Sequence, residues 1–416
     1  MKIKFYYVRH GQTIFNTLGR LQGMCDSPLT TKGIEDAQEV ASVLRNIAFD
    51  AVYASTSERA WKTANIICAY QKQSPILMKE LREFDFGNLD GQKIDEFQDA
   101  VWGEGMREDW SAFDGETMEI FAKRSRHAFE TMFSQCKDGD NVLVVSHGSY
   151  IMHLMRTLLH FDQAAYIRKR ESEGKAWIPN CGICVFSYED GKWQMEEEPV
   201  TAQEYRNLHF PKTLHYYLVR HGETQFNTTH RLQGQCDSPL TKTGKQQVMQ
   251  ASLKLKDVHF DACYTSTSER ARDTADILLQ QRNLQPIWDE RLKEVNFGTL
   301  EGSNYLENFE EQNQRFYAMH YKDIGGEDAE DVKKRIRTFL RDASDEAKDG
   351  DTILLVSHAN FYTLVLEELF GISREHLFQE SRAKGINPTP NAGICKFDYD
   401  KGKWNLLETM NGEKYV

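Results

Sequence analysis

The stretch VRHGQTIFNTLGRLQGMCDSPLT, from Val8 to Thr30, returns later in the chain as VRHGETQFNTTHRLQGQCDSPLT, from Val219 to Thr241. When Phe5–Gly33 is aligned with Tyr216–Gly244, 20 of the 29 positions are identical, which is far more than chance allows. Each copy follows a short apolar run rich in aromatic residues, a pattern that predicts a buried strand ending in a glycine turn. The chain therefore contains one structural unit twice.

The repeat keeps a constant offset of 211 residues. His10 matches His221 and Trp193 matches Trp404, so no net insertion or deletion separates the first landmark from the last. The unit is thus about 200 residues long, and the chain is a tandem duplication. We expect one domain over residues 1–205, a linker over residues 206–213 and a second domain over residues 214–416. The linker candidate is the polar stretch Met195–Pro211, whose end the linker overlaps.

Within each unit, apolar strands alternate with amphipathic helices. In the first unit, strands are predicted over Asp50–Ala54 and Asn141–Ser146, and helices over Lys32–Ile47 and Thr117–Cys136. Such alternation is typical of a mostly parallel sheet that is covered by helices on both faces. The predicted fold class is therefore α/β, with two tandem three-layer α/β/α domains, each containing a mostly parallel sheet.

The overall composition, 40% hydrophobic and 27% charged, is that of a soluble globular protein. No apolar run approaches the roughly 20 residues needed to span a bilayer, and the start MKIKFYYVRHG does not resemble a signal peptide. The net charge of −12, without a basic tract, argues against nucleic-acid binding. We expect a cytoplasmic protein with no nucleic-acid or membrane partner, whose eight cysteines are reduced.

The candidate chemistry lies at the ends of predicted strands. The Arg-His-Gly triplets at residues 9–11 and 220–222 each follow the first strand of a unit, and open α/β sheets bind ligands at that edge. A second histidine, His147 or His358, follows a later buried strand and can reach the same edge. Arginine forks suit phosphate oxygens, an imidazole can attack, and a nearby carboxylate can exchange a proton. This combination indicates phosphoryl transfer.

Four motifs together resemble the histidine phosphatase superfamily, whose fold is phosphoglycerate mutase-like: RHGxTxxN, a helix with SxxxRAxxTA, a loop with LxE…FGxxxG, and Ser-His at a strand end. The resemblance covers both units almost end to end. It implies that His10 and His221 become phosphohistidines and that Glu83 and Glu294 are proton donors. It also implies a phosphate pocket in each unit, made of Arg9, Asn16, Arg59 and His147 and again of Arg220, Asn227, Arg270 and His358.

Several of these residues have an alternative interpretation. Arg59 could be a surface arginine paired with Glu58, and Asn16 could be a turn residue as well as a ligand. For the glutamines Gln22 and Gln233, substrate contact and loop packing are equally open.

The two units differ in two places near the expected site. The segments Gln92–Asp114 and Ser303–Gly325 diverge, which suggests two different substrate pockets, although their aromatic residues, such as Trp102 and Trp110, are more typical of a core. In addition, unit two has Ala359 at the position that matches Gly148, directly after the second histidine.

The expected function is a phosphoric monoester hydrolase that acts on a small phosphorylated metabolite through a phosphohistidine, without metal or cofactor. Both domains are expected to be active, as a pseudo-dimer within one chain. One alternative is a bisphosphoglycerate-dependent mutase, but such mutases carry an extra segment between the glutamate and the second histidine, whereas this span is 64 residues in both units. Another is a phospho-ligand-binding regulatory protein with a single active domain.

Overall fold

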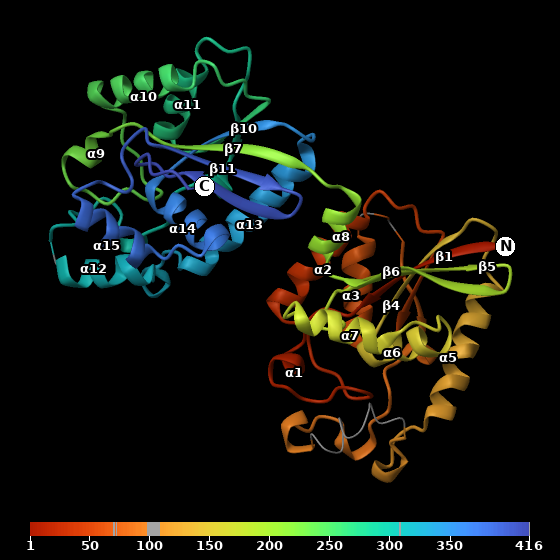
Figure 1. Cartoon of the computed structure of the whole chain (residues 1–416). Helices are drawn as coiled ribbons and strands as arrows, with labels where there is room; N and C mark the ends of the chain where they lie inside the picture. The colour runs from red at the N-terminus through yellow and green to blue at the C-terminus, as the bar shows by residue number, and fades with distance from the viewer. Residues whose placement is uncertain (70, 72, 98–108, 308, 416) are drawn as a thin grey trace. The chain divides into compact units, whose positions relative to one another are not determined.

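The structure is a computed structural model that describes residues 1–69, 71, 73–97, 109–307 and 309–415, and every structural statement concerns these residues. They form two compact units, Met1–His209 (unit 1) and Phe210–Val416 (unit 2) (Figure 1). Each unit has its own six-stranded sheet. Trp102, in one of the divergent segments, lies outside the described residues.

The sheet of unit 1 has the strand order β3-β2-β4-β1-β5-β6. Its strands are β1 (Lys2–Arg9), β2 (Ala51–Ser55), β3 (Ile76–Met78), β4 (Asn141–Ser146), β5 (Ile183–Glu189) and β6 (Lys192–Val200). The first four run parallel to one another, whereas β5 and β6 add an antiparallel pair at the β1 side. The sheet is mostly parallel, as predicted.

Alternate residues of β1 divide the interior of unit 1 into two cores. Phe5 and Tyr7 point to one face and pack with α5, α6 and α7, while Tyr6 and Val8 point to the other and pack with α2, α3 and α8. Figure 1 shows these helices on the two sides of the sheet. The helices are α1 (Ile14–Thr17), α2 (Thr31–Leu44), α3 (Glu58–Cys68), α5 (Met118–Phe133), α6 (Gly148–Thr157), α7 (Gln163–Ser172) and α8 (Ala202–His209), with short 3₁₀ turns η1 (Lys79–Leu81), η2 (Gly87–Leu89), η3 (Ile94–Phe97) and η4 (Ser111–Phe113).

Unit 2 repeats this architecture with the strand order β12-β11-β7-β10-β8-β9. Its strands are β7 (Thr213–Arg220), β8 (Ala262–Ser266), β9 (Ile287–Asp289), β10 (Thr352–Ser357), β11 (Ile394–Asp400) and β12 (Lys403–Glu408). Its helices are α9 (Gln225–Thr228), α10 (Lys242–Lys254), α11 (Glu269–Leu279), α12 (Phe309–Ala318), α13 (Ala329–Glu346), α14 (Ala359–Phe370) and α15 (Arg374–Lys384), with 3₁₀ turns η5 (Glu290–Leu292), η6 (Gly298–Leu300) and η7 (Lys322–Ile324). Two cores again lie on opposite faces of the sheet, so the predicted three-layer α/β/α fold is confirmed in both units.

The stretch Met195–Pro211, interpreted as polar linker, is largely regular structure. It contributes the end of β6 and the whole of α8, so residues 206–209 belong to a helix of unit 1. The three glutamates of this stretch each form an ion pair: Glu196 with Lys4, Glu197 with His209 and Glu198 with Lys169. Charged side chains of this kind are common on the edge strand of a sheet.

Other expectations from sequence hold to within a few residues. The strand predicted over Asn141–Ser146 has those bounds, whereas the two predicted helices end three residues early, at Leu44 and Phe133. All eight cysteines lie within the described residues and are free thiols. None of the described helices is long and apolar enough to cross a membrane.

Phe5 at the centre of β1 offers a test of this core. Its fully buried ring contacts Phe129, Phe186 and Trp193, so Phe5→Ala should lower the free energy of unfolding of unit 1 by about 3–5 kcal/mol. Hydrogen exchange of the β4 amides reports on unit 1 alone. As a control, Ile120→Ala removes a side chain that is 56% exposed and should change stability by less than about 0.5 kcal/mol. Equal effects of the two variants would contradict the assignment of the core.

Candidate active site

The two histidines predicted at strand ends lie together in unit 1. His10 follows β1 and His147 follows β4, and these neighbouring parallel strands keep their last residues in register. The centroids of the two rings are 5.3 Å apart. The same pairing in unit 2 brings His221 and His358 to 5.2 Å. The parallel sheet therefore places both rings of each unit at one edge, as the sequence predicted.

His10 is buried and is held as a neutral imidazole. Its Nδ1 lies 2.8 Å from the carbonyl oxygen of Gly11, so Nδ1 carries the proton and Nε2 keeps its lone pair. Burial lowers the pKa of His10 well below its usual range, and the guanidinium groups of Arg59 and Arg9 lower it further. A neutral ring with an unprotonated Nε2 is the form that can attack phosphorus.

Arg59 in α3 is fully buried beneath the loop of residues 22–26. Its two terminal nitrogens donate to three carbonyl oxygens of this loop and to the Asp26 carboxylate, all within 3.1 Å. The alternative, a surface arginine paired with Glu58, is wrong, because Glu58 pairs with Lys62 instead. The guanidinium is a fixed part of the site, and its charge acts on the His10 ring.

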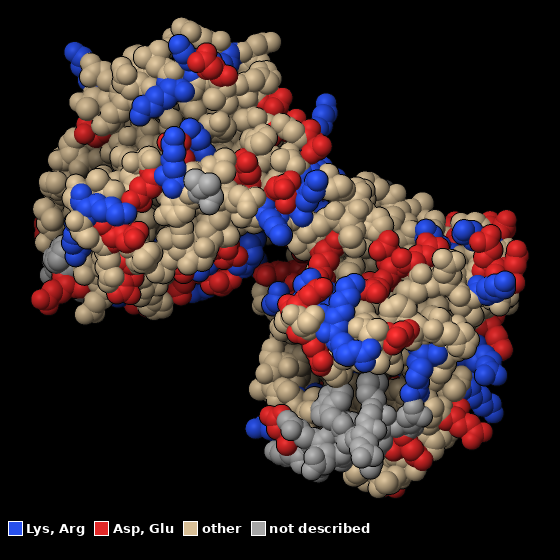
Figure 2. Space-filling model, in the orientation of Figure 1, with Lys and Arg blue, Asp and Glu red and all other residues tan. Residues whose placement is uncertain are grey.

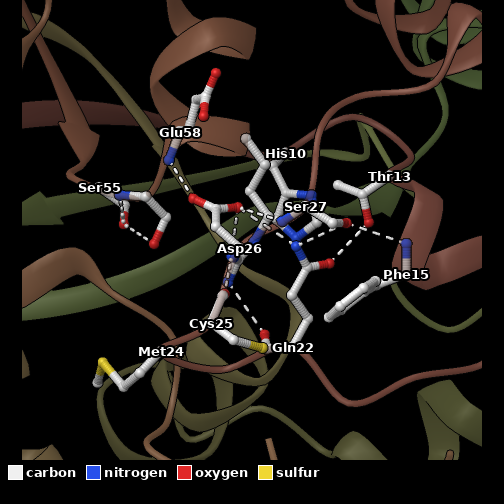
Figure 3. Close-up of polar contacts among 12 residues, drawn as sticks. His10, Thr13, Phe15, Gln22, Met24, Cys25, Asp26, Ser27, Ser55 and Glu58 are labelled. Atoms are coloured by element: carbon white, nitrogen blue, oxygen red, sulfur yellow. Dashed lines mark hydrogen bonds and ion pairs between the residues drawn. The ribbon is translucent and has the colours of Figure 1, made fainter. Parts of the chain in front are cut away.

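Asp26 holds this arginine in place, and Figure 3 shows its carboxylate beside the backbone nitrogen of Glu58. One carboxylate oxygen accepts from Arg59 at 2.9 Å, and the other accepts from the backbone N–H of Glu58 at the start of α3. Asp237 makes the same two contacts with Arg270 and the start of α11 in unit 2. Sequence reasoning did not select this aspartate, although it is part of the repeated CDSPLT motif.

Glu83 reaches the site from the loop after η1. Its carboxylate accepts from the backbone N–H of Phe84 at 3.1 Å and from that of Ser149, in the first turn of α6, at 2.9 Å. Burial is the largest influence on Glu83 and raises its pKa above the usual value. The carboxyl group therefore retains a proton more readily than an exposed glutamate, which suits a general acid.

The loop that carries Glu83 is fastened by Arg124 in α5. This guanidinium pairs with Glu116 at 2.7 Å and donates to the carbonyl oxygens of Glu80, Arg82 and Glu83 at 2.7–2.9 Å. The arginine thus fixes the backbone on both sides of the carboxylate without contacting the carboxylate itself. Arg335 and Glu327 repeat the arrangement in unit 2.

Asn16 is both a capping residue and a candidate ligand. Its carboxamide oxygen accepts from the backbone N–H of Thr13 and from Nδ2 of Asn180, both at 3.1 Å. Only the Nδ2 donors of Asn16 therefore remain for a ligand. Asn227 has the same contacts in unit 2, with Thr224 and Asn391.

Gln22 lines the cavity, but both ends of its side chain are engaged in the loop. Its oxygen accepts from the Thr13 hydroxyl at 2.7 Å, and its Nε2 donates to Ser27 at 3.3 Å, as Figure 3 shows. Gln233 makes the equivalent contacts in unit 2. Loop packing is therefore observed for both glutamines, and substrate contact stays a prediction.

Three buried N–H or ring-nitrogen groups around His10 have no hydrogen-bond partner among the described residues: Nε of Arg9, Nε of Arg59 and Nδ1 of His147. The other ring nitrogen of His147 lies 2.8 Å from the Ser55 hydroxyl. The equivalent atoms of Arg220, Arg270 and His358 are likewise without a partner in unit 2. Buried polar groups in proteins are normally hydrogen-bonded. Their shared lack of partners, duplicated in both units, indicates a site prepared for an anion.

A cavity opens above this cluster in each unit. In unit 1 it measures about 440 Å³, and its wall includes Arg9, His10, Asn16 and Glu83. The unit-2 cavity, of about 350 Å³, includes the four equivalent residues. Arg59 and His147 of unit 1 are fully buried next to the lining residues, and so are Arg270 and His358 of unit 2. The structure thus brings the predicted catalytic and phosphate-binding residues of each unit around one cavity.

The walls of the two cavities differ, as the divergent segments suggested. Trp110 is buried against Phe86, and Tyr321 is buried against Phe297, so these aromatic residues are core residues that also face a cavity. Ala359 is accommodated without disturbing α14, which begins at Ala359 as α6 begins at Gly148.

Comparison with known proteins defines the class of protein. The model of the histidine phosphatase superfamily (branch 1) matches residues 5–199 and again residues 216–412. The chain therefore belongs to the histidine phosphatase superfamily and carries two copies of its domain.

Individual relatives match about half of the chain, the length of one unit. The protein named "Probable phosphoglycerate mutase GpmB" of Escherichia coli O1:K1 / APEC is 34% identical over 197 residues, which cover 46% of this chain and 87% of that protein. Among solved structures, a phosphoglycerate mutase from Bacillus anthracis str. Sterne is 27% identical, with a TM-score of 0.42 over 48% of this chain and 94% of its own. A phosphoserine phosphatase from Entamoeba histolytica is also 27% identical, with a TM-score of 0.40 over 48% of this chain and 98% of its own.

The environment of His10 predicts an unusual titration. Because burial and two arginines disfavour the imidazolium, the ring of His10 should protonate, by NMR, at a lower pH than the histidine of a reference peptide, whose pKa is about 6.5. Inorganic phosphate should raise the pKa of His10, since an anion offsets the arginine charges. An ordinary titration of His10 in the folded protein, unaffected by phosphate, would contradict the assigned electrostatics.

Proposed function

We propose that each unit hydrolyses a small phosphomonoester through a phosphohistidine intermediate, without a metal ion. The observation that carries the proposal is the neutral His10 ring, whose unprotonated Nε2 lies among buried donors that have no protein partner. A nucleophile surrounded by positive charge suits attack on a phosphate dianion. The equivalent His221 has the same Nδ1 contact with its neighbouring glycine, at 2.8 Å.

In the first step, Nε2 of His10 attacks phosphorus while the bond from phosphorus to the ester oxygen breaks. The protonated carboxyl group of Glu83 gives its proton to the departing oxygen, so an alcohol leaves rather than an alkoxide. Arg9 and Arg59 stabilise the charge on the transferring group. In this role His147 would donate from Nδ1, with the Ser55 hydroxyl donating to its Nε2.

In the second step, a water molecule attacks phosphorus and the bond from phosphorus to Nε2 breaks. Glu83, now a carboxylate, takes the proton from water. Inorganic phosphate leaves, and both His10 and Glu83 return to their starting protonation states. The two steps therefore balance with water as the only co-reactant.

The side chains at each site suit stabilisation of the phosphoryl charge by arginine. Among the described residues, no group of three or more His, Cys, Asp or Glu side chains is placed to hold a metal ion. Acidic and basic side chains are interspersed over the face shown in Figure 2, so a small phosphorylated metabolite fits the cavities better than an extended anionic polymer.

A phosphoglycerate mutase is the second candidate, favoured by the name of the Escherichia coli relative. A mutase returns the phosphoryl group to a second hydroxyl, whereas a phosphatase passes it to water. Monitoring 3-phosphoglycerate by ³¹P NMR separates the two, because a phosphatase forms inorganic phosphate and a mutase forms the 2-phospho isomer.

The duplicated site predicts two independent activities. His10→Ala and His221→Ala should each leave hydrolysis by the other unit, and the double variant should lose at least about 10³-fold in kcat, since both nucleophiles are gone. The measurement is phosphate release from nitrophenyl phosphate by folded full-length chain. Complete loss in one single variant would show that only one unit turns over, as in a regulatory protein.

The role of Glu83 predicts a dependence on the leaving group. Glu83→Gln, in a His221→Ala background, should slow transfer from an alkyl phosphate by about 10²–10⁴-fold but slow transfer from nitrophenyl phosphate much less, because nitrophenolate leaves without a proton. Single-turnover kinetics isolates this step, and Glu119→Gln, at an exposed position of α5, serves as the matched control. If both substrates lose the same factor, Glu83 only positions other groups.

A further inference from the structure

Arg374 in α15 differs from the other buried arginines. Of the arginine side chains that the structure describes, five are buried: Arg59, Arg170, Arg206, Arg270 and Arg374. Four of them contact a carboxylate, namely Asp26, Glu204, Glu39 and Asp237 in that order. Arg374, only 3% exposed, forms no ion pair with any described residue. The carboxylates of Glu294 and Glu367 favour the charge of Arg374, but neither contacts the guanidinium directly. A buried cation without a directly paired carboxylate is costly, so its retention requires another reason.

The contacts of Arg374 are all neutral. Nη2 donates to the Asn360 side-chain oxygen at 2.9 Å, Nη1 donates to the Thr363 hydroxyl, and the guanidinium carbon lies 4.3 Å from the centroid of the Phe316 ring. Nε is buried and has no partner. Burial lowers the pKa of Arg374 to about 10, so the group is still charged near neutral pH.

All three of these contacts are wall residues of the unit-2 cavity. Asn360, Thr363 and Phe316 line it together with His221 and Glu294. The charge of Arg374 therefore lies behind the part of the wall that Asn360, Thr363 and Phe316 form. In a low-dielectric interior such a charge acts over several ångströms and favours an anion in the cavity.

The described residues of unit 1 include no buried arginine at the equivalent position. The position that matches Arg374 is Gln163, whose side chain donates to the Met152 carbonyl oxygen. Ser149 and Met152 stand in place of Asn360 and Thr363. Unit 1 therefore lacks, at these two positions, the side chains that connect Arg374 of α15 to the cavity in unit 2. A basic residue of the unit-1 wall, Arg156, is exposed to solvent, where its field is screened.

We propose that Arg374 forms a second anion subsite in unit 2, which therefore takes a phosphomonoester whose leaving group carries a second anionic group. This group is a carboxylate or a second phosphate, since both present charged oxygens to a guanidinium. The proposal rests on the proposed function of unit 2, because the first subsite is the phosphate pocket around His221. Because Gln163 stands at the matching position of unit 1, the two units would prefer different substrates.

The test compares substrates that differ only in the second charge. In a His10→Ala background, kcat/KM is measured for 3-phosphoglycerate, for neutral-ended glycerol 3-phosphate and for propane-1,3-diyl bisphosphate. Arg374→Gln should lower kcat/KM about 10–100-fold for the probe whose second anion is recognised and change that for glycerol 3-phosphate by less than about threefold. The probe that responds identifies carboxylate or phosphate.

Two controls separate charge from structure. Arg374→Lys keeps the charge and should retain part of the preference, and Arg382→Gln, which removes an exposed charge from the same helix, should leave all ratios unchanged. If Arg374→Gln lowers turnover of all three probes by one factor, Arg374 merely supports Asn360 and Glu294, and the subsite is refuted.

A binding measurement distinguishes failure of the subsite from failure of the proposed hydrolysis. In the non-hydrolysing His10→Ala, His221→Ala chain, calorimetry with the same probes should show weaker binding of the doubly anionic ligand after Arg374→Gln. That result supports the subsite even if unit 2 turns over no substrate. Equal affinities with and without Arg374 would overturn it.

Discussion

A buried guanidinium clamped to a loop is the constraint on which each site depends. Arg59 and Arg270 are fully buried, and each engages the carbonyl oxygens of the preceding loop and one aspartate. The aspartate carboxylate also caps the start of the helix that carries the arginine. The loop, the helix and the charge are thereby held together, and the histidine ring beside them lies in the positive field of the guanidinium.

The positive field has two consequences that act together. It helps to keep His10 neutral before the reaction, because the imidazolium would be repelled by Arg59 and Arg9. The same arginines also have buried Nε–H groups without a partner among the described residues. Such groups are unfavourable until an anion accepts their hydrogen bonds. The unsatisfied groups lower the stability of each unit but keep the site preorganised for an anion. Burial of the large hydrophobic cores offsets this cost.

The two units share the residues that hold the candidate site but differ in the side chains around the cavity. The shared residues recur at the same offset: Ser55 and Ser266 behind the second histidine, Arg124 and Arg335 behind the glutamate loop, and Asn180 and Asn391 beside the asparagine. The surroundings of the cavity differ instead: Met152 and Gln163 line it in unit 1, whereas in unit 2 Thr363 lines it and Arg374 lies behind its wall. The two units therefore share the residues of the candidate site and differ in the side chains around the cavity.

The sequence by itself determined the duplication, the α/β alternation and the residues at the strand ends, because these depend on local periodicity and on a repeat visible in one chain. The strand-end histidines met as expected, since parallel strands bring their carboxyl ends to one edge. Only the tertiary structure decided which partners the charges take. Asp26 pairs with Arg59 across 33 residues of sequence, Arg374 bonds to neutral side chains and forms no ion pair within the described part of the chain, and the glutamates of β6 are engaged in ion pairs. Burial and pairing of charges depend on contacts between distant segments, and no local pattern reports them.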